Sequence, residues 1–258
     1  MISKQYRFIQ VHIPRTAGSS IQDALWRYRD LNTEGVHPQR HADFYGKYDW
    51  HLNGFYPNIT QSAEVDNGIQ HVGQDFYSYV TKHLSQDSKP VSMGYGYEKF
   101  EEYFKFAFVR NPWDRFVSLW SKFKEEVKLQ ENFNNLYGLK IDHDFKEMEE
   151  VLRYLWLSHK RGLALPRWFK PQYEFVHAKD LKILTNFIGR YETLQDHFNF
   201  LCDRIDYPQC QLPHSDKGER RQEKEGAHYV QYYDQRNADI IAEIYKNDLE
   251  TWNYEFGE

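Results

Sequence analysis

The sequence lacks several features that would tie it to secretion or to a membrane. It has 2 cysteines in 258 residues, Cys202 and Cys210, too few for the disulfide framework of a secreted domain. We expect both thiols to be reduced, a single bridge between them being the alternative. No window approaches the ~20 apolar residues of a membrane-spanning helix, and the N-terminus, MISKQYRF, lacks the apolar stretch of a signal peptide. These absences predict a cytoplasmic protein without a membrane span.

An excess of positive charge is also absent. Lysine and arginine number 33 and aspartate and glutamate 38, so the formal net charge is −5. The overall charge therefore argues against nucleic acid as a partner. It also disfavours a polysulfated partner, unless basic side chains gather locally.

Aromatic residues, in contrast, are plentiful, at 17% of the chain. We interpret most of these rings as core and packing residues, the alternative being that some line a groove for a sugar or another flat ligand. The length suits one large domain over residues 1–258. Residues 30–80 are rich in Gly, Pro, Asn, His and Tyr with weak periodicity, and we interpret them as loops that form an acceptor-binding insertion.

Hydrophobic periodicity predicts strands that alternate with helices. Residues 193–205 begin with a Thr193–Asp196 capping pattern, and Asn111 is the expected N-cap of the helix after the second strand. The order predicts an α/β protein with a P-loop-like three-layer fold, in which helices flank a central, mainly parallel sheet. We expect strands at 6–13 and 104–109, one or two strands within 181–192, and helices from about Ser20, at 112–128, 148–157, 193–205 and 237–256.

The segment HIPRTAGSS (12–20) joins the first strand to the first helix. Compared with the P-loop pattern GxxxxGK[ST], Ser19 stands where the lysine would be, and the basic residue is Arg15 instead. A helix N-terminus with small residues suits a terminal phosphate. The alternative is an ordinary tight connection between a strand and a helix, which would have a similar sequence. The predicted phosphate-binding residues are Arg15, Thr16, Ala17, Gly18, Ser19 and Ser20.

A second candidate phosphate site lies in FAFVRNPWDRFVSLW (106–120). Arg110 leaves a buried strand at the edge where open α/β sheets bind ligands, and Ser118 follows in the next helix. An arginine fork and a hydroxyl would hold a second, separate phosphate. The alternative is that Arg110 pairs with Asp114 and that Ser118 has no role.

These two segments together resemble those of a known family. HIPRTAGSS resembles the 5′-phosphosulfate-binding loop of sulfotransferases that use 3′-phosphoadenosine 5′-phosphosulfate (PAPS), and FAFVRNPWDRFVSLW resembles their 3′-phosphate-binding segment. The second is most similar to the carbohydrate sulfotransferase branch. The likeness extends to 187–202, to 232–256 and, more weakly, to 170–176. The family's first loop usually carries lysine where this chain has Arg15.

The resemblance implies transfer of a sulfuryl group from PAPS to a hydroxyl or amine of a carbohydrate or small-molecule acceptor, with release of 3′-phosphoadenosine 5′-phosphate (PAP) and without a metal. Arg15 would stabilise the departing phosphate, and Arg110 and Ser118 would hold the 3′-phosphate. The expected base is His83 in TKHLSQ, with His71 in QHVG as second choice.

Further expectations concern the charged loop and the alternatives. The loop HSDKGERR (214–221) resembles a family element, which would bring Lys217 and Gly218 to the nucleotide; a plain solvated loop is the alternative. Two other functions stay open at this stage. One is a P-loop small-molecule kinase, which Ser19 argues against, and the other is an inactive nucleotide-binding relative.

Overall fold

The architecture comes from a computed structural model. The structure describes residues 2–3, 6–26, 101–140, 145, 147–177, 183–213 and 229–258. The expected acceptor-binding insertion at 30–80 lies outside these residues, and the assignment of 1–258 to one domain stays a prediction.

The described strands form one sheet in the order β1-β2-β3-β4. β2, β3 and β4 are parallel, and β1 pairs antiparallel with β2. This confirms the mainly parallel sheet, with β3 at the bounds expected from its apolar run. The two-residue β1 was not predicted, because so short a segment carries no periodicity. The strands are β1 Ile2–Ser3, β2 Phe8–Val11, β3 Phe104–Val109 and β4 Phe187–Arg190.

Helices follow each of the parallel strands. The helix after β3 begins as predicted, because the Asn111 side chain accepts a hydrogen bond from the Trp113 N–H and Pro112 occupies the first turn. The described helices are α1 Gly18–Trp26, α5 Pro112–Glu125, α6 Val127–Tyr137, α7 Met148–Lys160, α8 Tyr173–Val176, α9 Leu194–Arg204, α10 Gln235–Ile244 and α11 Lys246–Trp252, with 3₁₀ turns η1 Arg167–Phe169 and η3 Tyr229–Tyr232.

Alternation along the strands produces the three layers. Side chains of one parity pack against α1 and α9, and those of the other parity pack against α8 and α11. The sheet is therefore apolar on both faces, as parallel sheets usually are. The first face presents Phe8, Phe106 and Phe108, and the second presents Ile9, Val11, Ala107 and Val109.

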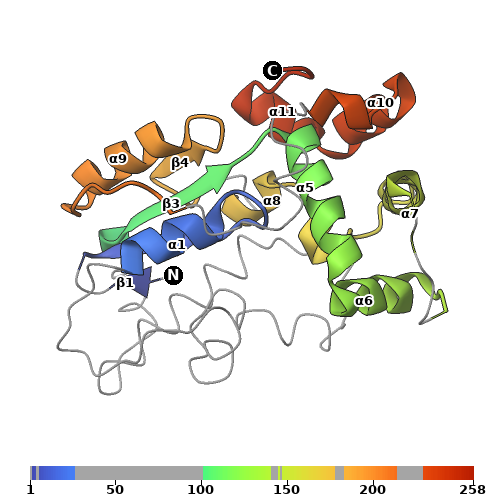
Figure 1. Ribbon diagram of the computed structural model, residues 1–258, viewed down its shortest axis with the longest axis horizontal. Coiled ribbons are helices and arrows are strands. Elements are labelled where there is room, and N and C mark those ends of the chain that lie inside the picture. The colour runs from blue at the N-terminus through green and yellow to red at the C-terminus, as the bar shows by residue number, and fades with distance from the viewer. Residues whose placement is uncertain are drawn as a thin grey trace.

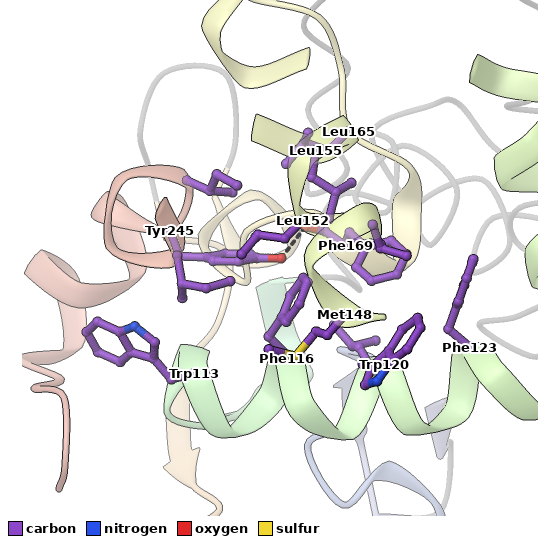
Figure 2. Close-up of a cluster of buried hydrophobic side chains, with 14 of the residues drawn as sticks. Trp113, Phe116, Trp120, Phe123, Met148, Leu152, Leu155, Leu165, Phe169 and Tyr245 are labelled. Carbon is purple, nitrogen blue, oxygen red and sulfur yellow. Dashed lines mark hydrogen bonds between the residues drawn. The ribbon is translucent and has the colours of Figure 1, made fainter. Parts of the chain in front are cut away.

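A separate cluster of buried side chains joins α5, α6, α7 and α10, which lie to one side of the sheet (Figure 1). Trp113, Phe116, Trp120 and Phe123 project from one face of α5 into it (Figure 2). These rings have the helical spacing of a core face. In the part of the chain that the structure describes, many aromatic side chains are thus buried in the core, as interpreted from the sequence.

The expected closing helix at 237–256 is wrong in its continuity. It is two helices, α10 and α11, with Tyr245 between them outside helical geometry. Tyr245 is buried, and its hydroxyl donates to the Phe169 carbonyl at 2.7 Å (Figure 2). Because this contact is made by a distant segment, the local 3.6-residue pattern does not reveal the break. Asp248 in α11 is buried.

Two smaller expectations are also corrected, and a third is made more exact. The helix from 112 ends at Glu125, because Glu126 is extended and α6 begins after it. Thr193 is the N-cap of α9 but makes no side-chain capping bond; its hydroxyl lies 2.9 Å from His197 Nδ1 instead. Within 181–192 the strand is Phe187–Arg190, and Ile183 forms an isolated bridge with His177.

Cys202 and Cys210 are free thiols in the structure, and their reduced state in the protein stays a prediction. Burial raises the pKa of the Cys202 thiol to about 12. None of the helices in the described part of the chain is long and apolar enough to cross a bilayer. The cytoplasmic location stays a prediction.

Candidate functional site

The loop between β2 and α1 is tightly curled. Arg15 and Ala17 both have left-handed backbone, with φ of 67° and 66°. This conformation costs a non-glycine residue about 1–2 kcal/mol, and such outliers gather at functional sites. Alternating handedness turns successive N–H groups toward one side, as in anion-binding loops. Ser19 and Ser20 follow in the first turn of α1, where both are partly exposed.

Two of the predicted loop residues take part in the packing of the loop itself. Thr16 is 2% exposed, and its hydroxyl donates to the Ile13 carbonyl at 2.9 Å. Gly18 lies against the His12 ring, so a Cβ at this position would come within 2.2 Å of the His12 Cε1 atom. A glycine is therefore required for close approach. That Thr16 and Gly18 contact phosphate stays a prediction.

The Arg110 side chain is held on three sides. Its Nε donates to Asp114 Oδ2 at 2.7 Å, and a terminal nitrogen donates to the Arg15 carbonyl at 3.3 Å. Its guanidinium carbon lies 4.0 Å from the centre of the Tyr191 ring. The pairing with Asp114, which the sequence left open, is thus present. These contacts hold the guanidinium in one orientation, and the Arg110 side chain is 14% exposed.

The two sequence motifs meet through a side-chain hydrogen bond. Arg15 Nε donates to Ser118 Oγ at 2.9 Å across 103 residues of sequence. Ser118 was expected beside Arg110, and the structure instead gives it Arg15 as its partner. Because the Arg110 side chain also reaches the Arg15 carbonyl, the structure brings all three residues together at the carboxyl edge of β2 and β3.

Arg115 supports this arrangement and was not singled out from the sequence. It is 1% exposed, and its guanidinium donates to three main-chain carbonyls. Burial lowers its pKa, an effect that the nearby Tyr245 and Asp248 oppose. Arg115 therefore ties the phosphate loop to the segment before α8. The acceptors are Pro14 at 3.0 Å, Lys170 at 3.1 Å and Trp168 at 3.1 Å.

Gln172 and Asp248 form a second buried connection to the site, also missed in the sequence. The Gln172 side chain pairs with the Arg110 main chain in both directions, at 2.9 and 2.8 Å. Asp248 accepts the N–H groups of Gln172 at 2.8 Å and of Tyr173 at 2.7 Å. No local signal marks these residues, because each contact crosses more than 60 positions of sequence.

Asp248 should make stability depend on pH. Burial raises its pKa to about 6, although the N–H groups of Tyr173 and Gln172 and the Arg115 charge act in the opposite direction. The folded protein holds this proton more tightly than the unfolded chain. The contribution of the carboxyl to stability is therefore complete below about pH 4, the ordinary range of aspartate, and is lost as pH rises through the folded-state pKa.

We predict that the free energy of unfolding of the wild type falls relative to that of Asp248→Asn as the pH rises from about 4 to about 6, the folded-state pKa. Urea unfolding of both proteins over a pH series measures the difference. Parallel pH curves would show that the buried carboxyl does not titrate in this window.

Glu192 and Asn111 fix the start of α5 beside the site. The Asn111 N–H donates to Glu192 at 2.6 Å, and the Asn111 side chain donates to the Tyr229 hydroxyl at 3.1 Å and to the Glu255 carbonyl at 3.0 Å. Glu192 also accepts from the Tyr254 hydroxyl at 3.1 Å. The last residues of the chain thus pack against the strand-to-helix turn that carries Arg110.

The remaining predicted residues, His83, His71, Lys217 and Gly218, lie outside the described residues. Within those that are described, no three His, Cys, Asp or Glu side chains are grouped so as to hold a metal ion. A groove of about 430 Å³ lies between α7 and α10, with Arg153, Trp156 and Arg236 in its lining. It contains none of the predicted site residues.

Comparison with known proteins identifies the class to which this loop, its two arginines and the α/β fold belong. The sequence model described as "Sulfotransferase family" matches residues 1–255, and the chain belongs to this family. It is similar to carbohydrate sulfotransferase 11 of Mus musculus, with 25% identity over 173 residues that cover 60% of this chain and 48% of the mouse protein. The chain thus spans about half the length of that relative. No solved structure matches it significantly.

Proposed function

We propose that this protein transfers a sulfuryl group from PAPS to a hydroxyl group of a carbohydrate and releases PAP. The observation that carries the proposal is the Arg15–Ser118 hydrogen bond, since it joins the two motifs expected to hold the two phosphate positions of one nucleotide. Membership of the sulfotransferase family supports the reaction class. The name of the mouse relative supports a carbohydrate acceptor.

The donor fits the residues present. The N-terminus of α1, with Ser19 and Ser20, offers N–H and hydroxyl donors to the 5′-phosphosulfate. Arg110, ordered by Asp114 and Tyr191, offers a planar cation to the 3′-phosphate. Ser118 accepts a hydrogen bond from Arg15, whose carbonyl in turn accepts one from Arg110. Thr16, Ala17 and Gly18 shape the loop, and Lys217 and Gly218 would complete the nucleotide contacts.

The reaction is an in-line displacement at sulfur. The acceptor oxygen forms a bond to sulfur while the bond between sulfur and the 5′-phosphate oxygen breaks, and the acceptor proton passes to a base. Arg15 and the loop N–H groups stabilise the charge that develops on the departing phosphate. The base is His83, with His71 as second choice. The acceptor is a glycan or a glycosylated small molecule that docks beside the nucleotide.

The kinase alternative is not favoured. A P-loop kinase uses its lysine to reach the β- and γ-phosphates, and this chain has Ser19 at that position. Arg15, at the start of the loop, is instead tied to α5.

A transfer assay tests the proposal. PAPS labelled at sulfur is incubated with the protein and with matched panels of neutral glycans, acidic glycans, peptides and phenols, and ATP labelled at the γ-phosphate is the control donor. Label from PAPS should appear on glycans alone. Label on peptides or phenols alone would contradict the carbohydrate acceptor. Transfer from ATP, or none from PAPS to any acceptor, would contradict the reaction class.

A further inference from the structure

Just beyond the end of β3, the main chain of Arg110 is hydrogen-bonded to a side chain instead of to a neighbouring strand. Arg110 is the first residue after β3. On one side, the adjoining Val109 carbonyl still accepts from the Tyr191 N–H at 2.8 Å, next to β4. Gln172 bonds both the N–H and the carbonyl of Arg110. The Gln172 amide thus serves as a side-chain substitute for a neighbouring strand.

Asp248 determines which way this amide faces. Its Oδ2 atom lies 3.3 Å from Gln172 Nε2 and also accepts the Gln172 N–H. An ionised carboxylate can only accept hydrogen bonds, so the NH₂ end of the amide must point toward it. The Oε1 end is then left to accept the Arg110 N–H, while the second hydrogen of Nε2 serves the Arg110 carbonyl.

The three residues form a closed, rigid unit. Gln172 and Asp248 are both 0% exposed, so water does not compete for these bonds. Asp248 belongs to α11, Gln172 precedes α8, and Arg110 follows β3. The charged or titratable groups that interact with Asp248 include Arg115 of α5, and Tyr245 and Tyr254 on either side of α11.

We propose that Asp248 is a positioning residue for the 3′-phosphate site, because it orients Gln172 and thereby fixes the main chain from which the Arg110 side chain projects. This inference rests on the proposed function, in which Arg110 binds the 3′-phosphate. Asp248 touches neither the nucleotide nor the reacting atoms in this account. Its effect should therefore appear in the recognition of one phosphate and not in binding as a whole.

The test compares PAP with adenosine 5′-monophosphate (AMP), which lacks only the 3′-phosphate. Calorimetric titration measures both affinities for the wild type, Asp248→Asn, Gln172→Met and a control, Tyr245→Phe. The control removes a buried hydrogen bond just before α11 and leaves Gln172 and Arg110 untouched. Asp248→Asn should flip or loosen the amide, and Gln172→Met keeps the side-chain length without its hydrogen bonds.

The preference for PAP over AMP should fall about tenfold in Asp248→Asn and in Gln172→Met, as expected for losing buried hydrogen bonds. AMP affinity should stay within about twofold, and the double variant should lose no more than either single one. Tyr245→Phe should be less stable with an unchanged preference. Circular dichroism checks that each variant is folded. If Asp248→Asn does not fold, the result for Gln172→Met decides the test.

Two results would overturn the proposals separately. If the wild type prefers PAP but both variants keep that preference, the positioning role is wrong while the proposed function stands. If the wild type binds PAP and AMP equally, Arg110 does not bind a 3′-phosphate, and the proposed function is wrong on this point before the role of Asp248 is tested.

Discussion

Replacing Arg115 with methionine is expected to lower the free energy of unfolding by about 3–5 kcal/mol. The guanidinium is 1% exposed and satisfies three carbonyls, those of Pro14, Trp168 and Lys170. Methionine keeps an unbranched stem of roughly similar volume but lacks the guanidinium, so the variant chiefly leaves these acceptors without a donor. A loss of this size is a large part of the stability of a typical domain. Urea unfolding followed by circular dichroism measures it.

Arg153→Met is the matched control for this prediction. Arg153 is an exposed residue in the middle of α7, and its replacement should change stability by no more than about 0.5 kcal/mol. Equal stability of the two variants would show that Arg115 does not hold the phosphate loop to the segment before α8. Arg115→Lys should fall between wild type and Arg115→Met, because an ammonium keeps the charge but not the fork.

Replacing Arg110 with alanine should weaken PAP binding by about 10- to 100-fold, the value of a lost charge-assisted contact to phosphate. Asp114, Tyr191 and the Arg15 carbonyl hold this guanidinium in one orientation, so little ordering remains to be done when the phosphate arrives. Titration calorimetry with PAP measures the effect.

Arg153→Ala is the control for Arg110→Ala, since it removes an arginine remote from the two motifs in sequence and should leave PAP affinity unchanged. AMP affinity should change little in Arg110→Ala, because AMP has no 3′-phosphate. PAP affinity at the wild-type level in Arg110→Ala would refute the 3′-phosphate role of this residue.

Much of the fold follows from local sequence because local periodicity and burial agree. The apolar run at 104–109 is a central strand with the bounds expected, since a strand covered on both faces needs no polar side. Asn111 and Pro112 mark the start of α5 unmistakably. The break at Tyr245 could not be foreseen, because the apolar residues keep helical spacing across it. The contact that accompanies the break, from the Tyr245 hydroxyl to the Phe169 carbonyl, is made with a segment distant in sequence.

The arginines expected to contact phosphate could be predicted from the sequence, but the buried residues that hold them in place could not. Arg110 and Arg115 occur in one RNPWDR segment, and nothing local says that one is partly exposed at the site while the other is fully buried. Gln172 and Asp248 are ordinary polar residues until the fold brings them to Arg110. The Arg15–Ser118 bond likewise joins two motifs that the sequence presents as separate phosphate sites.

The central claim, that this chain binds the sulfuryl donor nucleotide of a sulfotransferase, is tested most directly by thermal unfolding with and without ligand. PAP without added metal should stabilise the protein, by roughly 2.7 kcal/mol at a hundredfold excess over Kd, and ATP with magnesium should stabilise it much less. An equal response to PAP and to magnesium ATP would contradict the account.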